Sequence, residues 1–276
     1  MSGERAGRAS GTEESHLRVA QDAGRAGVRR ITIDRPEKLN AVGFALAGEL
    51  RDAFLDCAGQ DGLRCVVLAG AGKAFIGGAD LTEMAGLDAA GARRFITGLH
   101  QVCAAIRACP VPVIAEIGGH CLGGGLEIAA ACDLRIAADT ALFGMPEVRV
   151  GIPSVIEAAL LPRLIGWGRC QDILLTGRTF SAQDAHDWGF LSAVAPAAGL
   201  AAAVEGRLDE ILAGGAAALR LQKRLLTRWE ELALSDAVEA GIDSFADAYA
   251  GSDEPQRMMG AALAEMAARR RARQGG

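Results

Sequence analysis

The sequence of 276 residues lacks the patterns that mark several large classes of protein. Its seven cysteines stand singly in apolar stretches, without the paired spacings of disulfide frameworks or zinc sites, which favours a reduced, cytoplasmic location. No apolar run reaches the roughly 20 residues that cross a bilayer, because Arg, Glu, Pro or Gly interrupts each candidate. The net charge of −5 comes from 29 basic and 34 acidic residues mixed along the chain. The expected partner is therefore a small molecule, with neither nucleic acid nor a membrane.

Motifs of several enzyme classes are also missing. There is no Gly-x-Ser-x-Gly elbow, no phosphate-binding Gly-Lys-Ser/Thr loop and, with only four histidines, no metal-ligand cluster, so no metal is expected. Gly70-Ala-Gly72 and the segment 118–125 do not complete the glycine fingerprint of nicotinamide dehydrogenases. Residues 1–15 contain no apolar core of a signal peptide and are expected to form a disordered tail.

The order of apolar runs predicts an α/β protein. Strand-like runs occur at 17–20, 28–33, 65–69, 113–117 and 134–137, and helical patterns such as 44–57 and 90–107 separate them. This alternation predicts a mainly parallel sheet with crossover helices. From about residue 155 the pattern becomes helical, with Ser181 as an N-cap. We therefore divide the chain into the tail 1–15, a core 16–195 and a helical region 196–276.

Two glycine-rich segments carry the strongest chemical signal. Lys73-Ala-Phe-Ile-Gly-Gly-Ala-Asp-Leu81 and Gly118-Gly-His-Cys-Leu-Gly-Gly-Gly-Leu-Glu127 each end an apolar run in small residues that leave main-chain N–H groups uncovered. In the second segment the glycines open an apolar helix, so bare amides would stand at its positive end. The two segments together predict an oxyanion hole.

Two glutamates follow this pattern. Glu127 opens an apolar stretch, which places its carboxyl in a cavity or against a partner. Glu147 follows a Met-Pro turn. If both share one pocket, repulsion and desolvation would raise the pKa of at least one, so that one carboxyl gives a proton while the other takes one. The alternative for each is a structural ion pair with Arg135 or Arg149, and residue spacing alone does not separate the two readings.

Taken in order, these motifs resemble the crotonase, or enoyl-CoA hydratase/isomerase, superfamily over roughly residues 28–195. The matching stretches are Ile31-Thr-Ile-Asp-Arg-Pro-Glu-Lys-Leu-Asn-Ala41, Lys73-Ala-Phe-Ile-Gly-Gly-Ala-Asp80, Gly123-Gly-Gly-Leu-Glu127, Cys132-Asp-Leu-Arg-Ile-Ala137, Phe143-Gly-Met-Pro-Glu147 and Leu175-Thr-Gly-Arg-Thr-Phe-Ser-Ala182. The resemblance implies a ββα spiral core, a helical C-terminal trimerisation region, and a homotrimer or a hexamer built as a dimer of trimers.

The resemblance also implies roles for individual residues. The N–H groups of Ala79 and Gly124 would hold the thioester oxygen, Glu127 would activate water for attack at C3, and Glu147 would deliver a proton to C2. Coenzyme A, present only as part of the substrate, would contact Lys38, Leu39, Ala41 and Ala74, and no tightly bound cofactor is implied. The acyl pocket would include Leu81, Met84, His100 and Pro153, with Phe95 and Ile96 in a mobile wall from 81 to 99. The pattern around His100 by itself favours a satisfied core or groove histidine.

The chain departs from the family pattern at several positions. Glu116 stands in a strand-like run, where an ion pair or an interface is favoured over a third catalytic role. The stretch 151–158 is one residue short, and where some relatives carry an aspartate this chain has Ser154 or Val155. Glu157 is assigned to an exposed helix face, Trp167 and Trp188 are assigned to packing, and no aromatic and lysine that reach a neighbour's coenzyme are evident around 261–266.

The predicted function is therefore hydration of a 2-enoyl-CoA thioester across its 2,3 double bond. A Δ3,Δ2-enoyl-CoA isomerase, which can use a single acid/base residue, or another acyl-CoA lyase or hydrolase on the same scaffold is the alternative. A non-catalytic or RNA-binding relative is weaker, because the acidic balance and the complete acid pair argue against it. The acyl chain cannot be read from the pocket residues alone.

Overall fold

A computed structural model describes residues 15–274, and the predicted tail falls almost entirely outside these residues. The strands are β1 (Leu17–Gln21), β2 (Val28–Ile33), β3 (Cys65–Gly70), β4 (Ala74–Ile76), β5 (Val113–Ile117), β6 (His120–Leu122), β7 (Leu134–Ala138), β8 (Leu142–Gly144), β9 (Thr179–Ser181) and β10 (Ala193–Ala195). The α-helices are α1 (Phe44–Leu55), α2 (Leu81–Met84), α3 (Ala89–Ala108), α4 (Gly124–Ala131), α5 (Leu161–Ile165), α6 (Trp167–Thr176), α7 (Ala182–Asp187), α8 (Leu200–Ala213), α9 (Ala216–Trp229), α10 (Leu234–Gly251) and α11 (Glu254–Gln274). Short 3₁₀ helices lie at Pro36–Lys38, Asp56–Gly59, Glu147–Val150, Ile156–Leu160 and Ala197–Gly199.

The strands form two sheets. The larger one has the order β1-β2-β3-β5-β7-β10, antiparallel only between β1 and β2. The smaller one has the order β4-β6-β8-β9, with β9 antiparallel to β8. All five predicted strands are present, and the mixed α/β class is confirmed. The sequence reading missed β4, β6, β8, β9 and β10, because three residues are too few to show a period.

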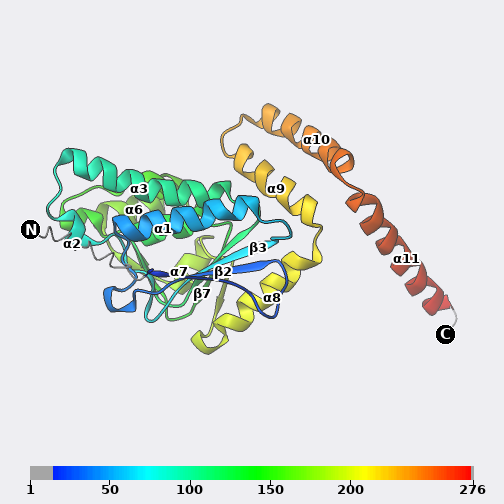
Figure 1. Cartoon of the computed structure of the whole chain (residues 1–276), viewed down its shortest axis with the longest axis horizontal. Coiled ribbons are helices and arrows are strands. Elements are labelled where there is room, and N and C mark those ends of the chain that lie inside the picture. Colours follow the sequence, from blue (N-terminus) through cyan, green and yellow to red (C-terminus); the bar gives the residue numbers. More distant parts are fainter. Residues whose placement is uncertain (1–14, 275–276) are drawn as a thin grey trace, which may run out of the picture.

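The larger sheet is covered by helices on both faces (Figure 1). Successive side chains along a strand are therefore buried on opposite faces of the sheet. On one face, side chains such as Leu68 and Val66 join α1 and α3 in the main core. On the other face, Val67 and Ile114 pack against α8 through Leu208 and its neighbours in a second cluster. The alternation follows from the period of two along a strand. The alanine-rich segment after residue 197 is thus a helix with one buried face.

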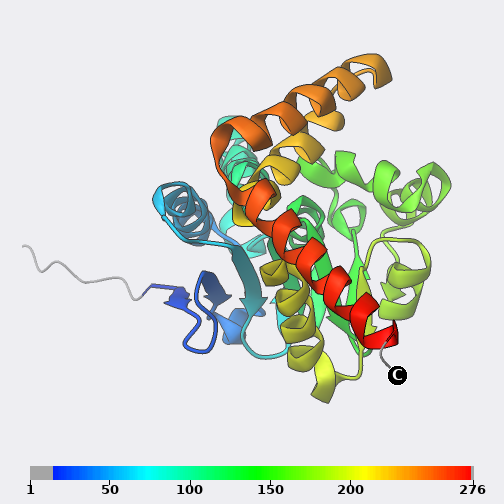
Figure 2. The same cartoon turned by 90° about the vertical axis from the view of Figure 1, so that its right-hand side faces the viewer.

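The last two helices, α10 and α11, leave the body of the molecule (Figures 1 and 2). Figures 1 and 2 show α10 and α11 extending beyond the sheets and their covering helices. Large apolar side chains on both are exposed: Leu234, Val238, Ile242, Phe245, Tyr249, Met258, Met259, Leu263 and Met266. Lys223 ties α9 to the core, because its buried ammonium donates to Asp133 Oδ2 at 2.7 Å and to two carbonyl oxygens. The helical character predicted for the last third of the chain is confirmed.

Two local expectations for the second half of the chain have different outcomes. Ser181 caps α7 as predicted, in a reciprocal capping box with Asp184. Trp188 packs on Phe180, with ring centroids 4.8 Å apart. The packing role predicted for Trp167 is wrong, since this side chain is 66% exposed at the start of α6. Between residues 15 and 274, no helix combines the length and the apolar composition needed to cross a bilayer.

Candidate active site

The glycines at the start of α4 bring the chain into close contact with its surroundings. Gly123 has φ +52°, a conformation that L side chains rarely adopt, and a Cβ built on it would lie 2.4 Å from Glu147 Oε1. A Cβ on Gly124 would lie 3.9 Å from both the Ala79 nitrogen and Glu127 Oε2. The glycine turn at the start of α4 therefore lies between the carboxyls of Glu147 and Glu127, and it is close to the main-chain amide of Ala79.

The amide of Ala79 is left free by the local hydrogen bonding. Its neighbours form the ladder to Val42: the Val42 N–H donates to Gly78 O at 2.9 Å, and the Asp80 N–H donates to Val42 O at 3.0 Å. Within residues 15–274, neither the Ala79 N–H nor the Gly124 N–H donates to another loop or side chain. Gly124 stands in the first turn of α4, where N–H groups have no partner within the helix. The two amides predicted for the oxyanion hole are thus both unused and near each other.

Glu127 is held in the interior. Only 3% of the residue is exposed, and its Oε1 accepts a hydrogen bond from the Ala158 N–H at 3.2 Å. Burial, followed by the charge of Glu147, raises the pKa of Glu127 to about 8. Near neutral pH, Glu127 therefore carries a proton.

Glu147 has a different environment. It starts a 3₁₀ helix, is half-buried, and its Oε2 accepts a hydrogen bond from Ser154 Oγ at 2.8 Å. Sequence reasoning considered Ser154 only as a replacement for an aspartate and missed this contact. Glu147 is thus more accessible than Glu127 and accepts from a hydroxyl, whereas Glu127 is buried and accepts from a main-chain amide.

The ion pairs considered for these glutamates are not made within the described part of the chain. Arg135 is buried and donates to the carbonyls of Phe190, Ala129 and Cys132. Arg149 donates to the Thr176 carbonyl. Both guanidinium groups donate to main-chain carbonyls instead, so the ion pairs considered for Glu127 and Glu147 with Arg135 and Arg149 are not formed.

A cavity of about 120 Å³ opens beside Glu147. Its lining includes Gly77, Gly78, Ala79, Leu81, Met84, Gly123, Pro146, Glu147, Val150 and Ile152. The structure therefore places Leu81 and Met84 where the pocket was predicted. The wall prediction is wrong for Phe95, which is buried in the core and packs edge-on against Phe44, with ring centroids 5.0 Å apart.

Two predicted pocket residues do not line this cavity, and one acid was misplaced. Pro153 is exposed and is not among the residues that line this cavity. The His100 side chain is 53% exposed, and its Nδ1 lies 2.9 Å from Glu157 Oε1. The exposed helix-face role of Glu157 is wrong, since only 8% of this residue is exposed.

The loop predicted to contact coenzyme A lies next to the oxyanion segment. Leu39 is 43% exposed with φ 52°, and Lys38 Nζ lies 3.4 Å from Asp80 Oδ2. Ala41 is partly exposed in the same loop. Ala74, by contrast, is buried in β4, so its side chain is not available to a ligand.

Two residues that sequence reasoning missed shape this loop. Asn40 is fully buried and donates from Nδ2 to the carbonyls of Ala71 and Ala74. Asp80 accepts hydrogen bonds from the Thr82 N–H and hydroxyl and from Arg35. These contacts, those of Thr82 first, lower the pKa of Asp80 to about 2. Both residues stood inside the matched motifs, which was the signal that could have found them.

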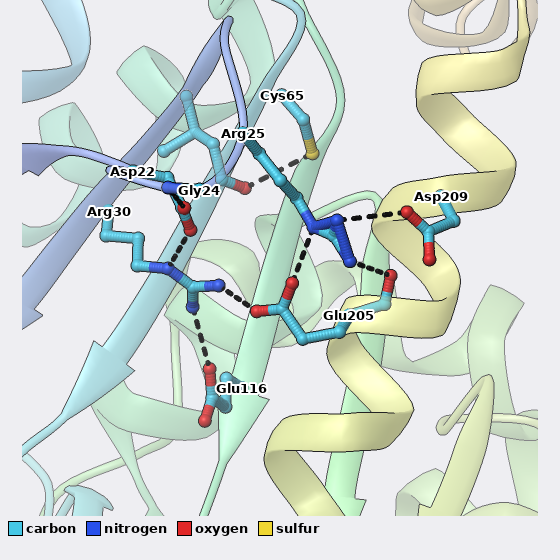
Figure 3. Close-up of polar contacts among 9 residues, drawn as sticks. Asp22, Gly24, Arg25, Arg30, Cys65, Glu116, Glu205 and Asp209 are labelled. Carbon is cyan, nitrogen blue, oxygen red and sulfur yellow. Dashed lines mark hydrogen bonds and ion pairs between the residues drawn. The ribbon is translucent and has the colours of Figure 1, made fainter.

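Glu116 takes the paired role that was favoured for it. Its strand β5 places it on the face covered by α8, where Arg30 NH1 lies 3.5 Å from Glu116 Oε2 (Figure 3). Arg30 also contacts Asp22 at 2.6 Å and Glu205 of α8. Burial raises the pKa of Glu116, and the Arg30 charge opposes this effect. The cluster joins β2, β5 and α8 on the opposite side of the larger sheet from Glu127.

Comparisons with known proteins agree with this geometry. The family model described as enoyl-CoA hydratase/isomerase matches residues 23–265. A protein of Mycobacterium bovis named "Probable enoyl-CoA hydratase" is 35% identical, with 83% of this chain and 88% of the relative covered. The crotonyl-CoA hydratase of Syntrophomonas wolfei is 34% identical over 82% of this chain and 88% of its own. The crystal structure of an enoyl-CoA hydratase from Bacillus anthracis is 31% identical, with a TM-score of 0.84 and coverage of 89% and 95%. This chain therefore belongs to the enoyl-CoA hydratase/isomerase family and has the crotonase fold.

Proposed function

We propose that the protein is an enoyl-CoA hydratase, which adds water across the 2,3 double bond of a 2-enoyl-CoA thioester. The observation that carries the proposal is the meeting of Glu127, Glu147 and the unused amides of Ala79 and Gly124 around one glycine turn. The amides would stabilise negative charge on the thioester oxygen as the enolate forms. The carboxyls would supply and accept the protons.

The proton balance suits a pair of carboxyls that shares one proton. Water gives its hydroxyl to C3 and its proton to the carboxylate, while the carboxylic acid gives its proton to C2, so the pair again holds one proton at the end. The resemblance assigns water to Glu127 and the C2 proton to Glu147. Burial of Glu127 favours the opposite distribution. The apparent pKa values belong to the pair, so exchange chemistry must separate the roles.

Two assays test the proposal. Hydration of short, medium and branched 2-enoyl-CoA substrates is followed by chromatography in the wild type, Glu127→Gln and Glu147→Gln, with Glu49→Gln as a surface control. A loss of 100-fold or more in both site variants, with acyl-CoA binding retained, is expected. Double-bond migration without hydration would support the isomerase, and no acyl-CoA binding would exclude both.

Exchange of the C2 hydrogen of a saturated acyl-CoA in deuterium oxide then assigns the roles. This exchange needs the oxyanion hole and the carboxyl that serves C2, but not the carboxyl that activates water. The variant that keeps exchange while losing hydration has lost the water-handling residue. Mass spectrometry of the recovered thioester measures the exchange.

We also propose a homotrimer, or a hexamer of two trimers, for the assembled enzyme. The exposed apolar side chains of α10 and α11, including Phe245 and Leu263, would be covered by neighbouring subunits. Analytical ultracentrifugation should give three or six chains per particle. A monomer at micromolar concentration would exclude this assembly.

A further inference from the structure

A third buried carboxyl lies behind the acid pair. Glu157 belongs to the 3₁₀ helix Ile156–Leu160, and its Oε1 is 2.9 Å from His100 Nδ1 of α3. Within residues 15–274, its Oε2 is buried without a hydrogen-bond partner. A buried carboxylate oxygen without a partner is costly, so its presence calls for a compensating role.

The backbone next to Glu157 reaches Glu127 directly. Ala158 follows Glu157, and its N–H donates to Glu127 Oε1 at 3.2 Å. Ile156, on the other side, has φ +37°, which is strained for a β-branched residue. Such a conformation persists only where surrounding contacts hold it. The tether from Glu157 to His100 is one such contact.

The charged and titratable groups around Glu157 come from the helices that pack on its segment. His100 and Cys103 face it from α3, and Glu127 faces it from α4. Arg163 of α5 donates instead to the Glu230 carbonyl, away from Glu157. Burial, followed by the charges of Glu157 and Glu127, raises the pKa of the Cys103 thiol well above its usual value, so Cys103 stays neutral. Glu157 and His100 are then the remaining titratable groups on this side of Glu127.

We infer that Glu157, tethered by His100, is a positioning residue for Glu127: it holds the Ala158 amide against this carboxyl and sets a second carboxylate beside it. The inference rests on the proposed function, in which Glu127 exchanges protons with water or with the substrate. The Glu157 charge favours the protonated form of Glu127, whereas the Ala158 amide favours the ionised form. His100 is the solvent-exposed end of this arrangement.

Two variants separate the two effects by sign. Glu157→Gln removes the charge and keeps a side chain that can hydrogen bond to His100, so the titration midpoint of Glu127 should fall by at least about half a pH unit. His100→Leu keeps the charge and removes the tether, so the midpoint should rise. Because glutamine at position 157 keeps the tether, adding His100→Leu to Glu157→Gln should raise the midpoint again from its Glu157→Gln value.

The direct readout is the ¹³C titration of the Glu127 side-chain carboxyl by NMR, assigned with Glu127→Gln. Glu49→Gln is the matched control, because Glu49 also belongs to a His–Glu pair. Glu49 lies on α1, away from the site, and its Oε1 is 3.2 Å from His16 Nδ1. Opposite shifts in the two single variants support the inference, and an unchanged midpoint in both overturns it. If Glu157→Gln does not fold, an unchanged midpoint in His100→Leu is sufficient to overturn it.

The pH profile of kcat/KM for hydration provides the second readout. The limb that reports Glu127 should move in the same direction as the NMR midpoint in each variant, whereas a merely structural defect would lower the rate without moving it. If the wild type does not hydrate enoyl-CoA, the proposed function fails while the NMR result still decides the role of Glu157. Limbs that stay fixed while the NMR midpoint moves would overturn the catalytic part of the inference.

Discussion

Replacing Glu127 with glutamine should stabilise the protein while removing its activity. The pKa of Glu127 is raised to about 8 from its ordinary 4.5, first by burial and then by the charge of Glu147. Between these two values the folded chain holds a proton that the unfolded chain has released. The free energy of unfolding therefore decreases as pH rises from 4.5 to 8. Glutamine keeps the shape of the protonated carboxyl and cannot ionise, so the variant lacks this loss.

The magnitude follows from the distance between the two pKa values. Each pH unit is worth about 1.4 kcal/mol, which gives an upper value of about 5 kcal/mol above pH 8. Relaxation around the ionised group reduces this figure, so we expect a gain of roughly 2 to 5 kcal/mol at pH 8.5. At pH 4.5 and below the gain should disappear, because Glu127 is then protonated in both states.

Urea unfolding at constant protein concentration, measured from pH 4.5 to 9, gives both stability curves. The difference between Glu127→Gln and the wild type should grow with pH and level off above about 8. Glu231→Gln, at an exposed position, serves as the control and should run parallel to the wild type. Parallel curves for Glu127→Gln and the wild type would refute the argument that Glu127 is protonated in the folded protein at neutral pH.

Three further changes test other parts of the structure. Gly123→Ala would place a Cβ against Glu147 at a positive φ, so kcat/KM for hydration should fall at least about 10-fold and stability by about 1–2 kcal/mol; an active variant would contradict the close approach. Asp80→Asn should cost about 1–2 kcal/mol in urea unfolding at pH 7. The ionised Asp80 carboxylate stabilises the folded chain, and this contribution is lost as pH falls through the lowered pKa of about 2. The cost of Asp80→Asn should therefore vanish at such low pH, and a cost independent of pH would contradict the argument. Arg30→Met leaves Glu116 buried without its cation and should cost about 1–3 kcal/mol, and Glu116→Gln in the same background should recover part of it; no recovery would show that the pair is not coupled.

The parts of the fold that sequence predicted are those set by long runs of apolar residues. β2 and β5 have the predicted bounds, because β-branched residues mark both ends of each strand. The smaller sheet was not predicted, since its strands have three residues each and pair only through contacts distant in sequence. Helix α4 was predicted because three glycines and an apolar run mark its start.

The candidate site was partly predictable for a similar reason. Gly124, Glu127 and Glu147 lie in motifs whose residue types predict their roles, because glycines leave main-chain amides uncovered and carboxyls exchange protons. Glu157 was placed on an exposed helix face because its neighbours, Ile-Glu-Ala-Ala-Leu-Leu, have helical character. The positive φ of Ile156 turns the chain before the regular helix starts and buries the carboxyl. A single strained residue cannot be inferred from a pattern that averages over several positions.

Several unfavourable features of this chain lie around one carboxyl. Gly123 and Ile156 both have positive φ, and each lies within a few residues of a group that contacts or faces Glu127. Glu127 itself ionises at a pH well above its ordinary value, and the oxygen of Glu157 behind it has no partner within the described residues. Strain and desolvation of this kind lower stability, so they persist only where surrounding contacts hold them and function requires them. The α4 start and the 3₁₀ helix of Glu157 hold Glu127 from two sides. Relieving either constraint should stabilise the fold and weaken the control of the proton on Glu127.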